Sequence, residues 1–171
     1  MGLPRTFVGF SSTDLHYYRL MKAWKVSEHL DFDFCDCQLQ QELNSENEAY
    51  IKRRCRERIN MAGTYLMLIG EDTRHKHKYV RWEAEVAIEQ GCIVIGVNLN
   101  MSRRLDRDRT PRVIRDIGAV FIAFSPQIVA YALENYEMKE DGDHVYKEQV
   151  YQKLGYSIHG NTVSRPKPRW I

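Results

Sequence analysis

The chain has 171 residues, of which 43% are hydrophobic and 28% are charged, and its formal net charge is +2. This length is typical of one domain with its own core, and the composition excludes a wholly disordered chain. A nucleic-acid-binding domain usually carries a marked basic excess. The near-neutral charge therefore gives no reason to expect a nucleic-acid partner.

The cellular location of the protein and the redox state of its cysteines can be predicted from the sequence. No apolar segment approaches the roughly 20 residues that span a bilayer, and the N-terminal sequence has no apolar run of the kind found in secretory signals. We therefore expect a cytoplasmic protein that does not associate with membranes. In a reducing compartment Cys35, Cys37, Cys55 and Cys92 are expected to be free thiols. Their spacing does not favour a metal site, and we expect none.

Short apolar runs alternate with amphipathic segments along most of the chain. Strands are expected over residues 6–10, 30–37, 64–70, 92–99 and 119–124. Helices are expected over residues 14–25, 45–62, 79–91 and 126–136, with a short helix within 109–118. Such alternation predicts an α/β fold with a five-stranded parallel sheet, right-handed crossovers and helices on both faces.

The end of the chain has a different character. A polar break, "EMKEDGDH", precedes "VYKEQVYQKLGYSI", which predicts one more helix, or a helix and an edge strand. We therefore expect a main domain over residues 1–137. Residues 138–171 are expected to form a C-terminal extension that packs on this domain or trails from it.

Polar residues follow four of the predicted strands. They lie at 10–14, at Asp36, at 70–72, and at Asn98 and Asn100. Because ligands of open parallel sheets bind beyond the carboxyl ends of the strands, these groups are expected to meet at one rim. The "SSTD" segment suits helix capping, which the sequence favours, but it also suits an anion at a helix N-terminus. No Gly-x-Gly-x-x-Gly or Gly-Lys-Ser/Thr motif is present, which argues against a dehydrogenase and a P-loop enzyme.

The predicted helix "YVRWEAEVAIEQG" carries one acidic residue on its apolar face. At about 100° per residue, two valines and an alanine fall within about 60° of Glu83, whereas Glu85 and Glu89 point to the opposite side. A carboxylate on an apolar face needs a compensating partner.

Two interpretations of Glu83 remain open on helical geometry alone. In the first, Glu83 lies at the margin of the helix and reaches water or pairs with Lys76 or Arg81. In the second, it faces a binding site and holds the hydroxyls of a ribose. A carboxylate placed there stabilises an oxocarbenium-like transition state as a glycosidic bond breaks.

Three segments together resemble the TIR-like domains of the ThsB type, the sensor component of Thoeris antiphage defence. They are "TFVGFSSTD", "TYLMLIGEDT" and "KYVRWEAEVAIEQGCIVIGVNLN". The resemblance covers about residues 6–124. It implies a flavodoxin-like TIR fold, with five strands and their helices in the TIR order.

The resemblance also implies a set of site residues. Glu83 matches the catalytic glutamate of the family because it directly follows the aromatic Trp82. Phe10 and Ser11 match positions that line the nucleotide pocket, and Asp14 matches the acidic residue that closes that motif. Phe10 and Trp82 would shape the pocket, while Ser11 and Asp14 would position the substrate.

The implied activity is cleavage of the nicotinamide–ribose bond of NAD+, which is a substrate, with no cofactor and no metal. The product would be a cyclic or conjugated ADP-ribose that diffuses to a downstream effector, formed after a phage-derived trigger and in a homo-oligomer. Two departures affect the pocket: Gly9 stands where serine is common, and Ser11 and Ser12 replace bulkier residues. The assembly loop of TIR domains does not align with residues 38–44.

Three alternatives to this assignment remain. Glu85 is the rival catalytic residue if the helix register is shifted, although it matches neither the motif nor the apolar face. A non-catalytic TIR-like assembly or adaptor module would use the same fold without chemistry. A nucleoside deoxyribosyltransferase-like enzyme would use a glutamate on a flavodoxin-like sheet with a different substrate.

Overall fold

The computed structural model describes residues 2–36, 48–75 and 78–165. Six parallel strands form the main sheet in the order β2-β1-β3-β4-β5-β6. The strands are β1 (Arg5–Gly9), β2 (Asp33–Cys35), β3 (Thr64–Ile69), β4 (Ile93–Asn98), β5 (Ile117–Ala123) and β6 (Gly142–Val145). The helices are η1 (Ser12–Asp14), α1 (Leu15–Ser27), α2 (Glu48–Asn60), α3 (Lys78–Glu89), η3 (Arg112–Ile114), α4 (Pro126–Asn135) and α5 (Glu148–Lys153).

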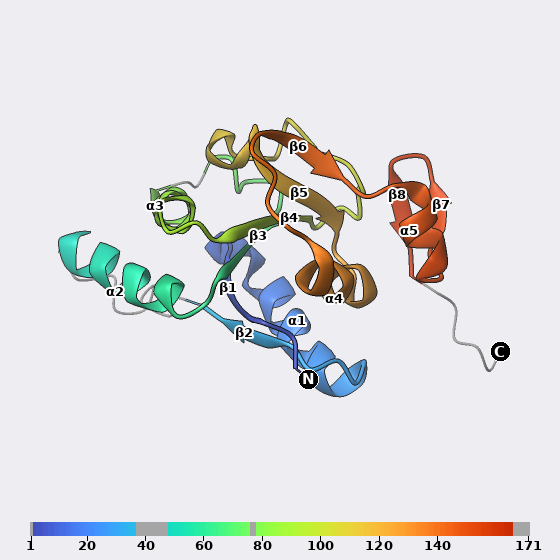
Figure 1. Ribbon diagram of the computed structural model, residues 1–171, viewed down its shortest axis with the longest axis horizontal. Helices are drawn as coiled ribbons and strands as arrows, with labels where there is room; N and C mark the ends of the chain where they lie inside the picture. The colour runs from blue at the N-terminus through green and yellow to red at the C-terminus, as the bar shows by residue number, and fades with distance from the viewer. Residues whose placement is uncertain (1, 37–47, 76–77, 166–171) are drawn as a thin grey trace.

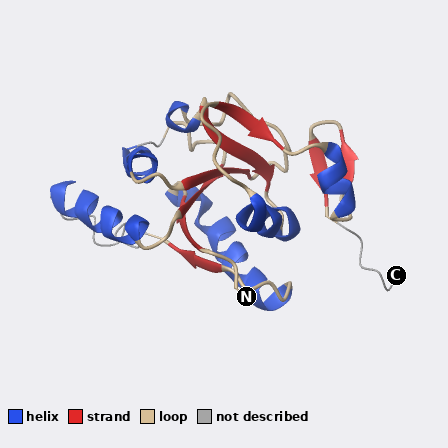
Figure 2. Cartoon of the chain, viewed as in Figure 1, coloured by secondary structure: helices blue, strands red, loops and turns tan. Residues whose placement is uncertain are grey.

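Helices cover both faces of this sheet, as Figures 1 and 2 show. One core lies between the sheet and α1 and α4, and we call it the α1/α4 side. The other lies between the sheet and α2, α3 and η3, and we call it the α2/α3 side. The central strand β3 is buried at every position because both of its faces are covered. The predicted α/β class with helices on both faces is confirmed.

The predicted number of strands is wrong, because the sheet has six and not five. The sixth strand, β6, begins within the predicted polar break at 137–144 and ends at Val145. It pairs in parallel with β5, with Ile117 opposite Gly142 and Val120 opposite His144. Its residues are half-buried or exposed. A short polar strand at a sheet edge gives no apolar alternation from which it can be predicted.

The rest of the C-terminal segment contributes to the α1/α4 side. After α5 the chain forms β7 (Ser157–His159) and β8 (Thr162–Ser164), which pair with each other in antiparallel fashion. Tyr151 of α5 is fully buried, and its hydroxyl accepts a hydrogen bond from the Ala123 backbone N–H at 3.3 Å. The predicted helix followed by a strand is present, but that strand pairs within this hairpin and not with the main sheet.

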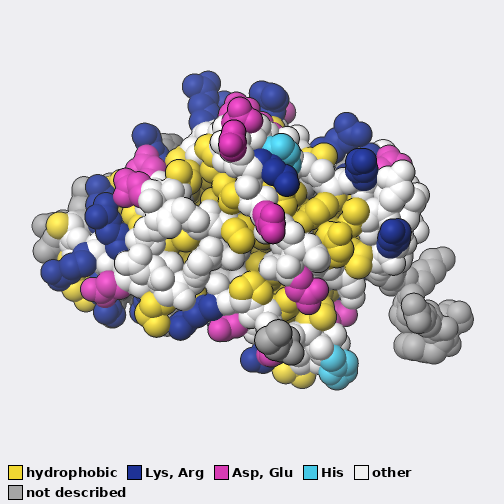
Figure 3. Space-filling view, viewed as in Figure 1, with side chains coloured by type: hydrophobic (Ala, Val, Ile, Leu, Met, Phe, Trp, Pro, Cys, Tyr) yellow, Lys and Arg dark blue, Asp and Glu magenta, His cyan; other side chains and the backbone are white. Residues whose placement is uncertain are grey.

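Several sequence-based expectations concern the surface and the cysteines. Charges of both signs are interspersed with apolar side chains on the face shown in Figure 3, as the near-neutral net charge suggests. Cys35, Cys55 and Cys92 are free thiols, while Cys37 and the loop at 38–44 lie outside the described residues. Among the helices described, none is long and apolar enough to cross a membrane.

Candidate functional site

The sheet has a topological switch point between β1 and β3. From β1 the chain moves outward to β2 and then returns to β3 on the opposite side of β1. Ligands of such sheets bind beyond the carboxyl ends of the strands at this point. A cavity of about 570 Å³ lies there. It is lined by Thr13, Asp14, His16, Tyr17, Gly70, Glu71, Asp72, Leu99, Asn100 and Arg109.

The loops after β1 and β3 are joined across this cavity. The Thr13 hydroxyl donates to the Asp72 carboxylate at 2.9 Å, and the Ser11 and Thr13 hydroxyl oxygens are 3.0 Å apart. Asp14 is buried, and its carboxyl group lies directly over Gly70, where an added Cβ would come within 2.8 Å of the Asp14 Cγ. The predicted meeting of these loops at one rim is therefore confirmed.

Helix capping does not explain the "SSTD" side chains. Ser11 is the N-cap of η1 and Asp14 the N-cap of α1, yet neither side chain makes a capping hydrogen bond within the described chain. The capping interpretation that the sequence favoured is wrong for these two residues. Both residues are instead buried at the rim, where the Ser11 hydroxyl bonds with that of Thr13.

The charge of the rim cavity is predominantly acidic. Three carboxylates line it, from Asp14, Glu71 and Asp72, against one guanidinium, from Arg109. The Arg109 Nη2 atom lies 3.7 Å from Glu71. An acidic, hydrogen-bonding surface favours hydroxyl-rich or cationic groups over a bare phosphate.

Glu83 is buried on the α2/α3 side, with 7% of its surface exposed. A Cβ added to Gly9 of β1 would lie 2.9 Å from the Glu83 Oε2 atom and would overlap the hydroxyl of Tyr65. The carboxylate therefore lies where α3 meets the end of β1 and the strand β3. A side chain at position 9 would therefore crowd both Tyr65 and Glu83.

The Tyr65 hydroxyl is the polar neighbour of this carboxylate that sequence reasoning missed. Tyr65 is fully buried in β3. Burial, and then the charge of Glu83, raise the pKa of the Tyr65 hydroxyl well above its ordinary value. The hydroxyl consequently stays protonated and remains a hydrogen-bond donor at neutral pH.

The other acids of α3 behave as the helical period predicts. Glu85 pairs with Arg81 at 2.8 Å and Glu89 pairs with Arg56 at 3.5 Å, and their side chains are 43% and 65% exposed. Arg81 is thus engaged by Glu85, which removes it as the expected partner of Glu83. Lys76, the other expected partner, lies outside the described residues.

Phe10 and Trp82 lie on opposite sides of the sheet. Phe10 is buried on the α1/α4 side and stacks on Tyr18 with ring centroids 4.8 Å apart. Trp82 is half-buried on α3, where the Lys52 ammonium of α2 lies 4.3 Å from its ring centroid. The structure therefore does not bring these two rings together. Within the described ranges, no group of three or more His, Cys, Asp or Glu side chains is arranged to hold a metal ion.

The strand order and the cavity at the switch point are those of a flavodoxin-like α/β domain. Comparison with known families agrees, since the family described as "Thoeris protein ThsB, TIR-like domain" matches residues 7–104. The chain belongs to this family, and membership supports a role in Thoeris defence. No curated protein matches the chain. The matched region includes Phe10, Ser11, Asp14, Trp82 and Glu83.

Proposed function

We propose that the protein cleaves the nicotinamide–ribose bond of NAD+ and converts the remaining ADP-ribose into a cyclic signalling nucleotide. The observation that carries this proposal is the burial of the Glu83 carboxylate against Gly9 and Tyr65, near the carboxyl edge of the sheet. In a TIR-like domain of the ThsB family, this is the acid that follows the aromatic residue of α3.

Glu83 would act on the ribose that carries nicotinamide. Its carboxylate holds the ribose hydroxyls and stabilises the positive charge that develops on the ring as the C–N bond breaks. The bonding electron pair leaves with nicotinamide, which departs neutral. A nucleophile within the same ADP-ribose, or water, then bonds to the ribosyl carbon and releases its proton to solvent. In this scheme neither a metal nor a cofactor is required.

The low exposure of Glu83 is what makes this role effective. A carboxylate surrounded by protein interacts more strongly with a developing positive charge than one in water, because the surroundings screen it less. Tyr65 lies on the same side and keeps its proton. Tyr65 therefore supplies a neutral donor and adds no negative charge that would compete with Glu83.

The remaining site residues have supporting roles in this proposal. Ser11 and Asp14 line or adjoin the rim and position the dinucleotide through its hydroxyl groups. Phe10 fixes the end of β1 from the α1/α4 side, and Trp82 holds α3 through its contact with Lys52 of α2. Each ring thus shapes the pocket by holding an element in place.

The proposed product is the signal that links this protein to its partners. It diffuses to a downstream effector, and a phage-derived trigger starts its synthesis in a cytoplasmic homo-oligomer. Activity assays therefore need extract from infected cells as the source of the trigger.

The release of a free base (nicotinamide or a nucleobase) distinguishes this proposal from the deoxyribosyltransferase and adaptor alternatives. The purified protein, with infected-cell extract added, is incubated with NAD+ or with deoxynucleosides, and free base is measured by liquid chromatography. Extract without the protein is the blank. We expect nicotinamide from NAD+ and no base from deoxynucleosides. Base from deoxynucleosides alone would identify a deoxyribosyltransferase, and no base from either substrate would identify an adaptor.

A further inference from the structure

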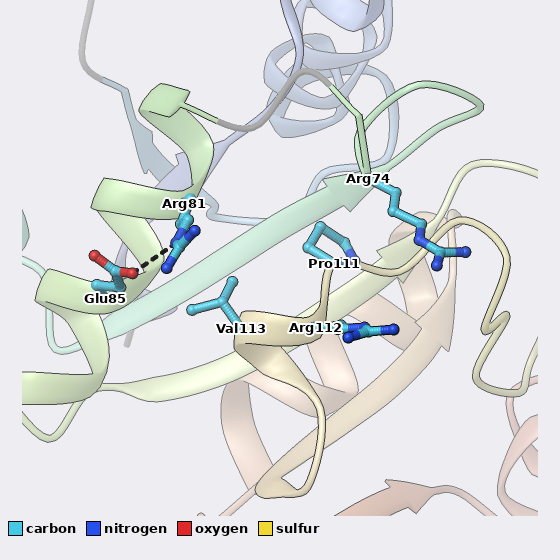
Figure 4. Close-up of a pocket in the computed structure, with 6 residues that line it drawn as sticks. All are labelled: Arg74, Arg81, Glu85, Pro111, Arg112 and Val113. Carbon is cyan, nitrogen blue, oxygen red and sulfur yellow. Dashed lines mark hydrogen bonds and ion pairs between the residues drawn. The ribbon is translucent and has the colours of Figure 1, made fainter.

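A second cavity, of about 440 Å³, lies on the outer side of α3. It is formed by α3, by the loop between β3 and α3, and by η3 with the residue before it (Figure 4). Its lining residues are Arg74, Arg81, Glu85, Pro111, Arg112 and Val113. We call it the arginine cavity. Its volume is within the range of about 300–1,000 Å³ that is usual for small-molecule sites.

The arginine cavity has an excess of positive charge. Three guanidinium groups and one carboxylate line it. The carboxylate, Glu85, is engaged by Arg81 at 2.8 Å. Arg74 and Arg112 form no ion pair with any residue that the structure describes. Among the described residues, two guanidinium groups of this cavity therefore have no counter-charge.

A nearby arginine, Arg115, is affected by this positive charge. Burial lowers the pKa of the Arg115 guanidinium, the charges of Arg74, Arg107 and Arg112 lower it further, and Asp143 opposes the shift. Arg115 itself is held by backbone carbonyls, donating to Thr110 at 3.1 Å. Arg115 is thus repelled by three other arginines in this region, and a bound anion would reduce that repulsion.

The cavity also has an apolar wall. Pro111 and Val113 lie between the two groups of charged side chains in Figure 4. Arg74 and Arg112 extend to one side of Pro111, and the Arg81–Glu85 pair lies across from them. A ligand that fills this cavity therefore needs a strongly anionic end and a part that can contact apolar surface.

This cavity is separate from the site of the proposed NAD+ cleavage. Arg81 and Glu85 are each two residues from Glu83, which places them about 160° away around the helix. Glu83 faces the sheet and is buried, whereas Arg81 and Glu85 are on the outer side of α3. A ligand of the arginine cavity would not contact Glu83.

We propose that the arginine cavity binds the phosphate of a nucleotide. Arg74 and Arg112 hold the phosphate, since a guanidinium presents a planar fork of donors that matches phosphate oxygens. Pro111 and Val113 contact the nucleoside, and the Arg81–Glu85 pair closes the far end. This site does not depend on the proposed cleavage of NAD+.

Titration calorimetry on the full chain tests this site with AMP, inorganic phosphate and adenosine as the probes. The variants are Arg74→Gln and Arg112→Gln. Arg19→Gln on α1 is the matched control, because Arg19 is exposed and lies on the α1/α4 side. Glu83→Gln is measured in parallel, and thermal melting shows whether each variant is folded.

We expect AMP to bind with a Kd below about 1 mM. Each cavity variant should weaken AMP binding by about tenfold, the usual effect of removing one charge-assisted hydrogen bond. Arg19→Gln and Glu83→Gln should bind AMP as the unmodified chain does, and phosphate and adenosine should each bind about tenfold more weakly than AMP. The proposal is overturned if AMP does not bind, or if the folded cavity variants bind it normally. Equal affinity for phosphate and AMP also overturns it, because the apolar wall would then contribute nothing.

Discussion

The two sides of the central sheet differ in the side chains that they bury. The α1/α4 side is dense with aromatic rings, including the buried Tyr18, Tyr136, Tyr151 and Tyr156. The hydroxyls of these four tyrosines bond within the protein, as that of Tyr156 does with Ser125 at 2.6 Å. The α2/α3 side instead places the buried Glu83 against β1 and β3 and carries the arginine cavity on the outside of α3.

This difference indicates that one side of the sheet mainly stabilises the fold, whereas the other carries the proposed catalytic residue. Buried hydroxyls with internal partners and close-packed rings fix a structure and leave little for a ligand to satisfy. The C-terminal residues add to the same side, because Tyr151 and Tyr156 belong to the α1/α4 core. A buried carboxylate stabilises a fold poorly by itself, so we assign the chemistry to Glu83 on the α2/α3 side and the positioning of the substrate to the rim beyond the strand ends.

The largest expected effect on stability is on the α1/α4 side. Ile122→Ala should lower the free energy of unfolding by about 2–5 kcal/mol, because it leaves a cavity in a fully buried position of β5. Ile88→Ala, at a 37% exposed position on α3, is the matched control and should cost much less. Urea unfolding measures both. If the two variants were equally destabilised, the α1/α4 core would not have the importance assigned to it.

A smaller effect is expected from crowding the Glu83 side. Gly9→Ala should cost about 1–3 kcal/mol, because the new methyl group overlaps the fully buried Tyr65 side chain. Nicotinamide release should fall as well, since Glu83 must move. Adding Tyr65→Phe removes the nearest atom and should restore part of the lost stability in thermal melts. A double variant no more stable than Gly9→Ala alone would show that the crowding lies elsewhere.

The smallest effect is the alkaline sensitivity of the α1/α4 side. Burial raises the pKa of Tyr136 from 10.0 to about 12. The folded chain then keeps a proton that the unfolded chain loses, so the stability contributed by this group is intact below pH 10 and lost as the pH rises towards 12. Urea unfolding at several pH values should show this decline, with a shallower slope in Tyr136→Phe. An identical slope in the two proteins would refute it.

Much of the fold was predictable because its central strands β3, β4 and β5 are buried on both faces. Continuous apolar runs such as β3 and β4 separate clearly from amphipathic helices, and their alternation fixes a parallel sheet. The strand β6 was not predictable, since an edge strand of polar residues shows neither a run nor an alternation. Its pairing with β5 depends on the surrounding structure.

The candidate site was predictable in part. The helical period placed Glu83 on the buried face of α3 and Glu85 and Glu89 outside it, as the structure shows. Successive residues of a strand point to opposite faces of the sheet, so the position of Phe10 directly after Gly9 predicts that Phe10 points away from α3. The expectation that Phe10 and Trp82 shape one pocket did not take this alternation into account. The role of Tyr65 could not be predicted, because a tyrosine within an apolar strand sequence is not distinguished from its core neighbours. The roles assigned to Phe10, Ser11, Asp14, Trp82 and Glu83 stay predictions.

Nicotinamide release by Glu83→Gln, compared with Glu89→Gln, tests the central claim most directly. Both substitutions remove a carboxylate from α3, but Glu89 is exposed on the outside of the helix. In preparations activated by infected-cell extract, Glu83→Gln should reduce the rate per folded molecule by about 100-fold or more. Glu89→Gln should release nicotinamide at the rate of the unmodified protein. Undiminished release by folded Glu83→Gln would contradict the assignment of Glu83 as the catalytic residue.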